Sequence, residues 1–436
     1  MSARARLRAI ATSVPIIVLA ALGLRVGYTI SQTQKIPPEV LRAVPYLYEP
    51  GNIAYSIAQG HGFGSPFRAD TGPTAWTAPI YPYIVAGFFK IFGIYSYHAF
   101  LAAISLNMLC SALACVPLYY AGKRIGGLGV GAGAAWLWAA FPNAIIIPFQ
   151  WIWDTSISTL LAATILWATI ELAESSQVRD WIGYGLLWGV TLMTNPTLAS
   201  LLPLLLGWLA WRASRAIRAP QETRQWIKNV AISAVVVGLC CVPWTIRNYI
   251  VFHAFVPTRS ALGFQLWIGN NEHYSDRWAV WKDPLDDQDE RDKYVAMGEM
   301  AYMAEKRREA IEFMLTHPQW EARTISRRFV ATWMGSATPI GDFVETHSFV
   351  IRGLLVSNLL AGIGALGGIF VLCRKRSVYA FPVSVFPIVY PFAEYLAQAL
   401  LRYRHPIDPI VMLLTAVAIA ELWRSVAPRR MRSDYS

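Results

Sequence analysis

The segment "WTAPIYPYIVAGFFKIFGIY", residues 76–95, decides how the rest of the chain is arranged. It is apolar and about as long as a membrane-spanning helix, but Pro79 and Pro82 punctuate it and Lys90 interrupts it. If it crossed a membrane, every later basic loop would change sides, against the bias of Arg and Lys towards the cytoplasm. We therefore predict an interfacial or re-entrant helix on the outer membrane surface.

The composition is that of an integral membrane protein. Of the 436 residues, 55% are hydrophobic and 15% are charged, whereas roughly 25% are charged in an ordinary soluble domain. The formal net charge of +11 does not indicate nucleic acid, because Arg and Lys gather at the ends of apolar segments. Cys110, Cys115, Cys240, Cys241 and Cys373 all lie within or at the ends of such segments, so we expect neither a disulfide framework nor a metal-binding pair.

Ten apolar segments have the length and character of membrane helices. They lie near 10–29, 97–121, 126–146, 154–173, 181–195, 197–213, 228–247, 349–372, 378–399 and 407–424. Ten crossings put the main basic clusters, around 4–8, 123–124, 179, 212–228, 374–376 and 429–432, on one side. We expect that side to be the cytoplasm, with both termini on it and the first segment retained rather than cleaved. The fifth and sixth segments could form a broken pair at Asn195-Pro196.

The predicted fold is therefore an all-α integral membrane protein in three parts. Residues 1–247 form an N-terminal transmembrane catalytic module, whose external loop 30–96 carries short interfacial helices. Residues 248–348 form a larger external segment, and residues 349–436 form the C-terminal transmembrane helices. Within the external segment, apolar residues at helical spacing predict an amphipathic helix over 290–316 that ends at His317-Pro318.

Two carboxylates stand at the predicted outer face. Glu49 precedes Pro50-Gly51, a helical turn predicted over 52–59, and a glycine-rich turn. Such an acid, set among tyrosines, could have a raised pKa and act as a general base, or it could stabilise a helix N-terminus through the dipole. Asp154 opens the fourth predicted span, where it either caps the helix or is solvated or paired at some cost.

Four arginines are predicted at the same outer face, although Arg and Lys are usually concentrated on the cytoplasmic side. Arg402 and Arg404 lie in "RYRHPID", and Arg247 and Arg259 follow the seventh predicted span. Guanidinium groups bind phosphate oxygens bidentately, although they could also snorkel to lipid headgroups. Carboxylates and arginines together fit a sugar donor linked to a lipid phosphate. In that chemistry the carboxylate takes a proton from an acceptor hydroxyl, and the arginines stabilise the departing phosphate.

These motifs resemble those of the GT-C glycosyltransferases related to protein O-mannosyltransferases and the lipid A aminoarabinose transferase. The likeness is carried by "EPGNIA" at 49–54, "GHGFGSPF" at 60–67 and "GPTAWTAPIYPYIVAGFFKIFG" at 72–93. It continues through "WDTSIS" at 153–158, "LMTNPT" at 192–197, "PWTIRNY" at 243–249, "LWIGNN" at 266–271 and "RYRHPI" at 402–407. It covers most of the chain and is weakest over 275–345.

The resemblance implies a polyprenyl-phosphate-sugar donor, used outside the cytoplasmic (inner) membrane to glycosylate a protein, lipid or glycan. Glu49 corresponds to the catalytic acid, although these enzymes usually have Asp there, and Asp70 is the second candidate for that role. Asp154 corresponds to the second acidic position.

Arg247, Arg402 and Arg404 would hold the lipid phosphate, with Tyr403 and His405 in support. A divalent metal is possible, as in relatives that use diphosphate donors, but no His/Cys ligand cluster is visible and no metal ligands are assigned.

Two other functional classes stay open. The Asn195-Pro196 break would suit a transporter or lipid flippase, but the charges cluster at one face rather than at the midplane, and the two halves show no symmetry. A non-catalytic partner of a cell-envelope assembly is also compatible with Glu49 standing where an Asp is usual.

Overall fold

A computed structural model describes residues 9–43, 46–216, 219–272, 282–335 and 349–426 of the chain. Within these ranges the fold is helical, and the only β-type contact is an isolated bridge between Gly64 and Pro73. The basic residues predicted at the two ends of the chain (Arg4, Arg6 and Arg8; Arg429, Arg430 and Arg432) lie outside the described residues. The prediction of an all-α protein is confirmed.

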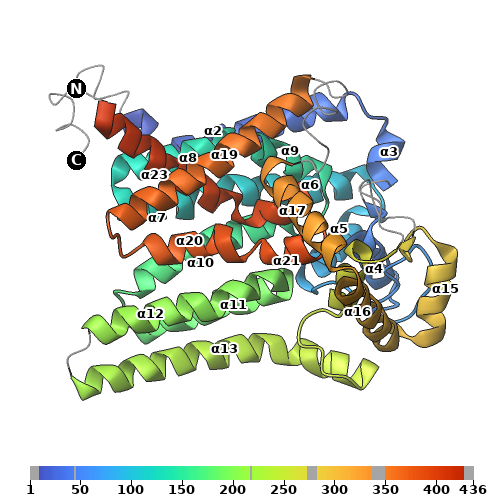
Figure 1. Cartoon of the computed structure of the whole chain (residues 1–436). Helices are drawn as coiled ribbons and strands as arrows, with labels where there is room; N and C mark the ends of the chain where they lie inside the picture. Colours follow the sequence, from blue (N-terminus) through green and yellow to red (C-terminus); the bar gives the residue numbers. More distant parts are fainter. Residues whose placement is uncertain (1–8, 44–45, 217–218, 273–281, 336–348, 427–436) are drawn as a thin grey trace.

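A bundle of long helices forms the body of the molecule (Figure 1). Its elements are α2 (Val14–Thr33), α6 (Tyr97–Leu113), α7 (Cys115–Gly126), α8 (Leu128–Ala140), α9 (Pro142–Gln150), α10 (Thr155–Leu172), α11 (Val178–Thr194), α12 (Leu202–Ala216), α13 (Pro220–Phe252), α19 (Phe349–Arg374), α20 (Ala380–Val389), α21 (Phe392–Leu396) and α23 (Asp408–Val426). Each of the ten predicted apolar segments coincides with one of these helices or with two consecutive ones.

Fewer than ten of the described helices are long and apolar enough to cross a membrane on their own. Six meet that test, or seven if α8 and α9, which are bent by 46° at Phe141, count as one span. The helices α11 and α12 have only 17 and 15 residues, and the short 3-10 turn η2 (Pro196–Leu201) separates them. The count of ten spans is therefore not confirmed, although the helical segments are where the sequence predicts them.

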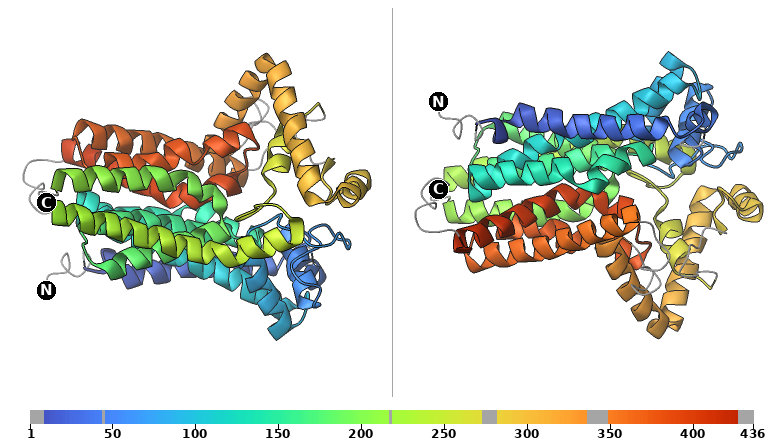
Figure 2. Two further views of the ribbon diagram at one scale, coloured as in Figure 1. Left: turned by 90° about the horizontal axis from the view of Figure 1, so that it is seen from below. Right: turned by 90° about the horizontal axis from the view of Figure 1, so that it is seen from above.

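The remaining helices gather at one end of the bundle (Figure 2). They are α3 (Pro38–Ala43), α4 (Glu49–Ala58), α5 (Ile80–Phe92), α14 (Leu262–Gly269), α15 (Gln288–Met297), α16 (Glu299–Thr316), α17 (Pro318–Met334), α22 (Leu401–Arg404) and the 3-10 turn η4 (His405–Ile407). The start of α2 and the end of α23 lie at the opposite end of the bundle (Figure 1).

The decisive segment 76–95 does not form a spanning helix. Only Ile80–Phe92 is helical, which is 13 residues and too short to cross a bilayer core. The helix ends at Gly93, which has a positive φ of 93° that glycine adopts without strain. Its buried face, which includes Tyr81, Val85 and Phe89, packs into a small hydrophobic core of its own with α4 and α6.

The external segment contains a helical hairpin rather than one long helix. The amphipathic helix predicted over 290–316 is interrupted at Gly298, whose φ of 76° separates α15 from α16. Its predicted end is confirmed, because α16 stops at Thr316 and Pro318 begins α17. The hairpin has its own core, in which Tyr294, Tyr302 and Phe264 pack against Phe67 and Trp76 of the first loop.

Candidate functional site

Glu49 is the first residue of α4, and its side chain is buried. The turn that leads into α4 is tight, because a Cβ on Gly51 would collide with the backbone carbonyl of Tyr46. Asn52, one residue further, donates a hydrogen bond of 2.8 Å to the carbonyl of Pro66. The short motif around Glu49 therefore serves to bend the chain and to tie α4 to the glycine-rich turn that follows.

The glycine-rich turn 60–67 is closed by backbone contacts. The hydroxyl of Ser56 donates to the carbonyl of Gly62 at 3.0 Å, and a Cβ on Gly64 would lie 2.6 Å from the carbonyl oxygen of Gly72. Gly60 and Gly62 both have positive φ, which other residues adopt only with strain. These glycines hold the turn beside α4 and so help to fix the position of Glu49.

The environment of Glu49 suits a proton acceptor. Burial raises the pKa of the Glu49 carboxyl above its ordinary value, while the charge of Arg402 and the indole N–H of Trp76 favour the ionised form. The helix-terminus interpretation is not excluded, since Glu49 does lie in the first turn of α4. A buried acid that faces a guanidinium and an indole has, however, more than a helix dipole to stabilise its charge.

Asp154 stands immediately before α10 and near the same arginine. Its carboxylate accepts a hydrogen bond of 2.8 Å from Ser158 rather than capping the backbone. Burial raises the pKa of Asp154, and the charges of Arg259 and Arg402 act in the opposite direction. Arg402 therefore influences both predicted carboxylates, and Arg259 is a second positive charge beside Asp154.

Arg402 is held by aromatic rings rather than by carboxylates. The centre of its guanidinium lies 4.3 Å from the ring of Trp151, 4.2 Å from that of Trp153 and 4.9 Å from that of Tyr403. Tyr48, next to Glu49, contacts both tryptophans. Such cation–π contacts orient a guanidinium without neutralising it.

The guanidinium of Arg402 keeps hydrogen-bonding capacity for a ligand. Nη2 donates to the hydroxyl of Tyr403 at 3.2 Å. Within the described part of the chain, Nε and Nη1 have no hydrogen-bond acceptor although both atoms are buried. Buried donors of this kind are costly when left unpaired, so a ligand with two oxygens would satisfy them.

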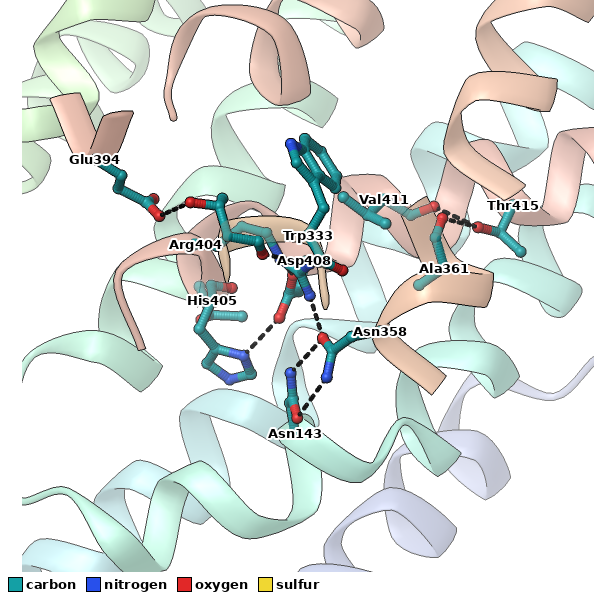
Figure 3. Close-up of polar contacts among 12 residues, drawn as sticks. Asn143, Trp333, Asn358, Ala361, Glu394, Arg404, His405, Asp408, Val411 and Thr415 are labelled. Carbon is teal, nitrogen blue, oxygen red and sulfur yellow. Dashed lines mark hydrogen bonds and ion pairs between the residues drawn. The ribbon is translucent and has the colours of Figure 1, made fainter. Parts of the chain in front are cut away.

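Arg404 is only two residues from Arg402 in the sequence, but its side chain does not lie at the site formed by Arg402, Glu49 and Asp154. It is completely buried, and its guanidinium donates to Asp408, to Asn358 and to the carbonyls of Thr332 and Trp333 (Figure 3). These protein acceptors take up most of its donors. The structure therefore brings Arg402, but not Arg404, to the two carboxylates.

His405 belongs to the same buried network. Its Nδ1 lies 3.0 Å from the second oxygen of Asp408 (Figure 3), and its ring packs against Trp138. Asp408 thus bridges Arg404 and His405, which are four and three residues before it. His405 is a structural neighbour of Arg404 inside the bundle, whereas Tyr403 contacts Arg402 at the site.

Arg247 ties the end of α13 to the first loop. Its Nη1 donates to the carbonyl of Thr74 and its Nη2 to that of Phe63, each at 2.7 Å. Asp70, the alternative acid, is exposed at the loop tip, where its carboxylate accepts from Ser65 and from the backbone of Gly72. Neither residue lies among the groups that act on Glu49.

A third carboxylate, which the sequence did not single out, lies near Glu49. Asp283 precedes α15, and burial together with the charge of Glu49 raises the pKa of Asp283 to about 7. Next to it, Asp286 forms an ion pair of 3.3 Å with Arg68 of the first loop. Residues 283–286 are thereby held over the start of α4, so the external segment completes one wall of the site.

No cluster of three or more metal-ligating side chains was found among the described residues. The charge of Glu49 acts on Asp283, and the charge of Arg402 acts on both Glu49 and Asp154, but these carboxylates form no ligand set in the described part of the chain. The site is therefore defined by carboxylates, the guanidinium of Arg402 with its two unpaired donors, and a wall of aromatic rings. It lies at the end of an apolar helical bundle and combines proton acceptors with an anion-binding group.

The comparison with known families supports the predicted resemblance. Residues 76–246 match the family model described as dolichyl-phosphate-mannose-protein mannosyltransferase. This stretch includes α5, which follows the glycine-rich turn, and Asp154, and it ends just before Arg247. No curated protein sequence matches the chain.

Solved structures share the fold. The oligosaccharyltransferase of Archaeoglobus fulgidus in its apo form is 12% identical, with a TM-score of 0.54 over 97% of this chain and 52% of that one. The oligosaccharyltransferase AglB from the same organism, in complex with an inhibitory peptide and a dolichol-phosphate, gives 12% identity, a TM-score of 0.50, and coverage of 97% and 51%. The chain thus spans about half the length of these proteins.

A third similar structure is ArnT from Cupriavidus metallidurans bound to undecaprenyl phosphate. It is 14% identical, with a TM-score of 0.38 over 98% of this chain and 80% of that one. From its apolar helices and the match to the archaeal oligosaccharyltransferase, the chain is a polytopic helical membrane protein that shares the fold of that enzyme. Its matched segment resembles the dolichyl-phosphate-mannose-protein mannosyltransferases in particular.

Proposed function

We propose that the protein is a membrane glycosyltransferase that moves a sugar from a polyprenyl-phosphate-linked donor to an acceptor hydroxyl. The observation that carries this proposal is Arg402, whose Nε and Nη1 are without acceptors among the described residues and whose charge acts on both Glu49 and Asp154. The match to the mannosyltransferase family and the dolichol-phosphate bound to AglB support a lipid-phosphate donor.

In this proposal Glu49 is the general base. Its carboxylate removes the proton of the acceptor hydroxyl as the oxygen attacks the anomeric carbon, and the bond from that carbon to the phosphate oxygen breaks. The phosphate leaves with the bonding electrons and remains on the lipid. Attack opposite the leaving group inverts the anomeric carbon.

Arg402 is the proposed contact to the departing phosphate. Its unpartnered Nε and Nη1 lie on different edges of the guanidinium, so each can donate one hydrogen bond to an oxygen of the ligand. The rings of Trp151 and Trp153 fix the orientation of this guanidinium. We assign a second contact to Arg259, and we assign to Asp154 the task of balancing the two arginines before the donor enters. Arg404, His405 and Arg247 are proposed to support the fold instead.

The proposed orientation puts this site outside the cytoplasmic membrane. The helix ends remote from Glu49 carry the basic clusters Lys123-Arg124 and Arg374-Lys375-Arg376, in α7 and α19. Under the positive-inside rule that end faces the cytoplasm, together with both termini. The acceptor, whether a protein, a lipid or a glycan, would then approach from outside, past the external segment that carries Asp283.

The direct test is a transfer assay in membrane vesicles with radiolabelled polyprenyl-phosphate sugars. Glu49→Gln should abolish transfer, and Arg402→Ala should weaken donor binding, while the matched controls Asp70→Asn and Arg215→Ala, the latter at an exposed arginine of α12, keep activity. Transfer at wild-type rate by folded Glu49→Gln protein would reject the base. Label that crosses the bilayer without reaching any acceptor would instead identify a transporter or lipid flippase.

A further inference from the structure

A groove of about 690 Å³ opens at the end of the bundle remote from Glu49. It lies between α10 and α11, with Arg124 of α7 at its edge. The α10 side is formed by Thr164, Trp167, Ala168 and Glu171, and the α11 side by Asp180, Gly183, Tyr184 and Leu187. Both sets recur at the three- and four-residue spacing of one helix face, so the two helices present a continuous slot that runs along their axes.

Gly183 keeps this slot open. A Cβ placed on it would meet nothing within 4 Å. By contrast, Gly185 and Gly189 of the same helix allow close packing, because a Cβ on Gly185 would lie 2.7 Å from the carbonyl of Ser233 and one on Gly189 would collide with Cys240. Glycine weakens a helix interior, and packing does not explain Gly183. Because Gly183 has no side chain, a ligand can occupy the groove at this position.

The inner part of the groove is apolar and its rim is charged. Trp167, Ala168 and Leu187 line the depth, and the ring of Trp167 stacks on Tyr120 at 5.4 Å. At the rim, Arg124 forms ion pairs with Glu171 at 3.0 Å and Glu174 at 2.6 Å. An apolar slot that ends in charged groups matches the shape of a single lipid molecule, with its chain inside and its head at the rim.

The rim is acidic, although the bundle end around it is basic. Glu171, Glu174 and Asp180 contribute three carboxylates to the lining, against the single guanidinium of Arg124. Asp180 accepts a hydrogen bond of 2.5 Å from the hydroxyl of Ser175 and forms a loose ion pair of 3.5 Å with Arg179, whose side chain is 81% exposed. The helix ends nearby carry Lys123, Arg215 and Arg374. The groove is thus locally acidic, and the positive-inside bias that explains the basic helix ends does not explain its carboxylates.

We propose that this groove binds one phospholipid whose headgroup carries a primary amine. Its acyl chain lies in the slot opened by Gly183, its phosphate contacts Arg124, and its ammonium contacts Glu174 and Asp180. The excess of rim carboxylates favours this zwitterionic head over an anionic one. The inference is independent of the proposed transferase site, which lies at the other end of α10.

The occupant can be identified by native mass spectrometry of the full chain released from nanodiscs containing equal amounts of phosphatidylethanolamine and phosphatidylglycerol. One retained phosphatidylethanolamine is expected for the wild type. Gly183→Leu should abolish its retention by filling the slot, whereas Gly207→Leu, where a Cβ also meets nothing within 4 Å, should retain it. Equal retention in both variants would overturn the site.

The headgroup assignment has its own test, which leaves the slot intact. In the double variant Glu174→Gln, Asp180→Asn, the ratio of retained phosphatidylethanolamine to phosphatidylglycerol should fall roughly threefold to fivefold, as expected from the loss of exposed charge contacts. A wild type that retains phosphatidylglycerol, a polyprenyl phosphate or no lipid would contradict the proposal. So would an unchanged preference in the double variant. Melting temperatures of all the variants serve as the check on folding.

Discussion

Arg404 and Asp408 form an ion pair of 2.7 Å in which both side chains are completely buried. They lie one helical turn apart, and Asp408 also pairs with His405. The same guanidinium donates to Asn358, which in turn exchanges hydrogen bonds with Asn143 (Figure 3). The start of α23 is thereby fastened to α19 and α9, so this pair holds helices that are far apart in the sequence.

Breaking that pair should destabilise the protein severely. Asp408→Asn leaves a buried guanidinium without its counter-charge, which costs about 3–5 kcal/mol. We expect a large drop in melting temperature and in the yield of folded protein in detergent. Arg402→Ala is the matched control, because Arg402 contacts rings and has donors without acceptors among the described residues. Similar losses in both variants would contradict the separation of a structural from a functional arginine.

The pH dependence of transfer should report the charges around Glu49. A general base works only when ionised, so the rise of activity with pH marks its pKa. Trp76→Phe removes a donor that favours the ionised form, so the rise should move to higher pH. Asp283→Asn removes a neighbouring negative charge, so it should move to lower pH. Shifts in the same direction, or none in either variant, would contradict Glu49 as the base.

Docking of the external segment should depend on Glu299. This buried carboxylate accepts hydrogen bonds from the backbone N–H of Ala75 and from the hydroxyls of Thr74, Ser260 and Tyr294. Glu299→Ala leaves these donors unpaired, at about 1–3 kcal/mol for each that stays buried. We expect limited proteolysis to cleave the segment between Lys282 and Gly298 much faster.

Glu305→Ala is the control for that experiment. Its carboxylate is 23% exposed and pairs at 3.2 Å with Lys293, which is 38% exposed, and such partly exposed ion pairs contribute roughly 0–1 kcal/mol. Its cleavage rate should stay near that of the wild type. If protease cleaved the Glu299→Ala variant no faster than the wild type, contacts other than those of Glu299 would hold the segment.

Position 51, at the tight turn into α4, should tolerate no residue larger than glycine. Gly51→Ala places a Cβ against the carbonyl of Tyr46, so α4 must shift and carry Glu49 with it. We expect transfer to fall at least tenfold, which corresponds to about 1.4 kcal/mol of lost transition-state stabilisation, with a smaller effect on melting temperature. Gly87→Ala in α5, where a Cβ meets nothing within 4 Å, should remain active.

Periodicity and charge were sufficient to predict the helical architecture. The prolines and lysine in 76–95 indicated that this segment would not span, and α5 is indeed short. The break at Gly298 was not predicted, because the apolar spacing continues through it. The number of membrane spans could not be predicted from the sequence either, because α11 and α12 are apolar but shorter than a bilayer requires.

The candidate site was only partly predictable. Arg402 and Arg404 look equivalent in the sequence, yet one faces aromatic rings and the other enters the core. The one available signal was Asp408, four residues after Arg404, where a carboxylate can pair along a helix. Asp283 could not be selected, because it is one of several acids in a long segment, and only the fold brings it towards Glu49.

The contacts of Glu299 also bear on any exchange of the external segment between related proteins. A graft cut at the ends of 248–348 would carry this carboxylate away from Thr74 and Ala75, which lie 225 and 224 residues earlier in the chain. The segment and the strip 74–76 must therefore be transplanted together, or the recipient must already match that strip. Any exchange of this part of the chain therefore involves two separate pieces of sequence.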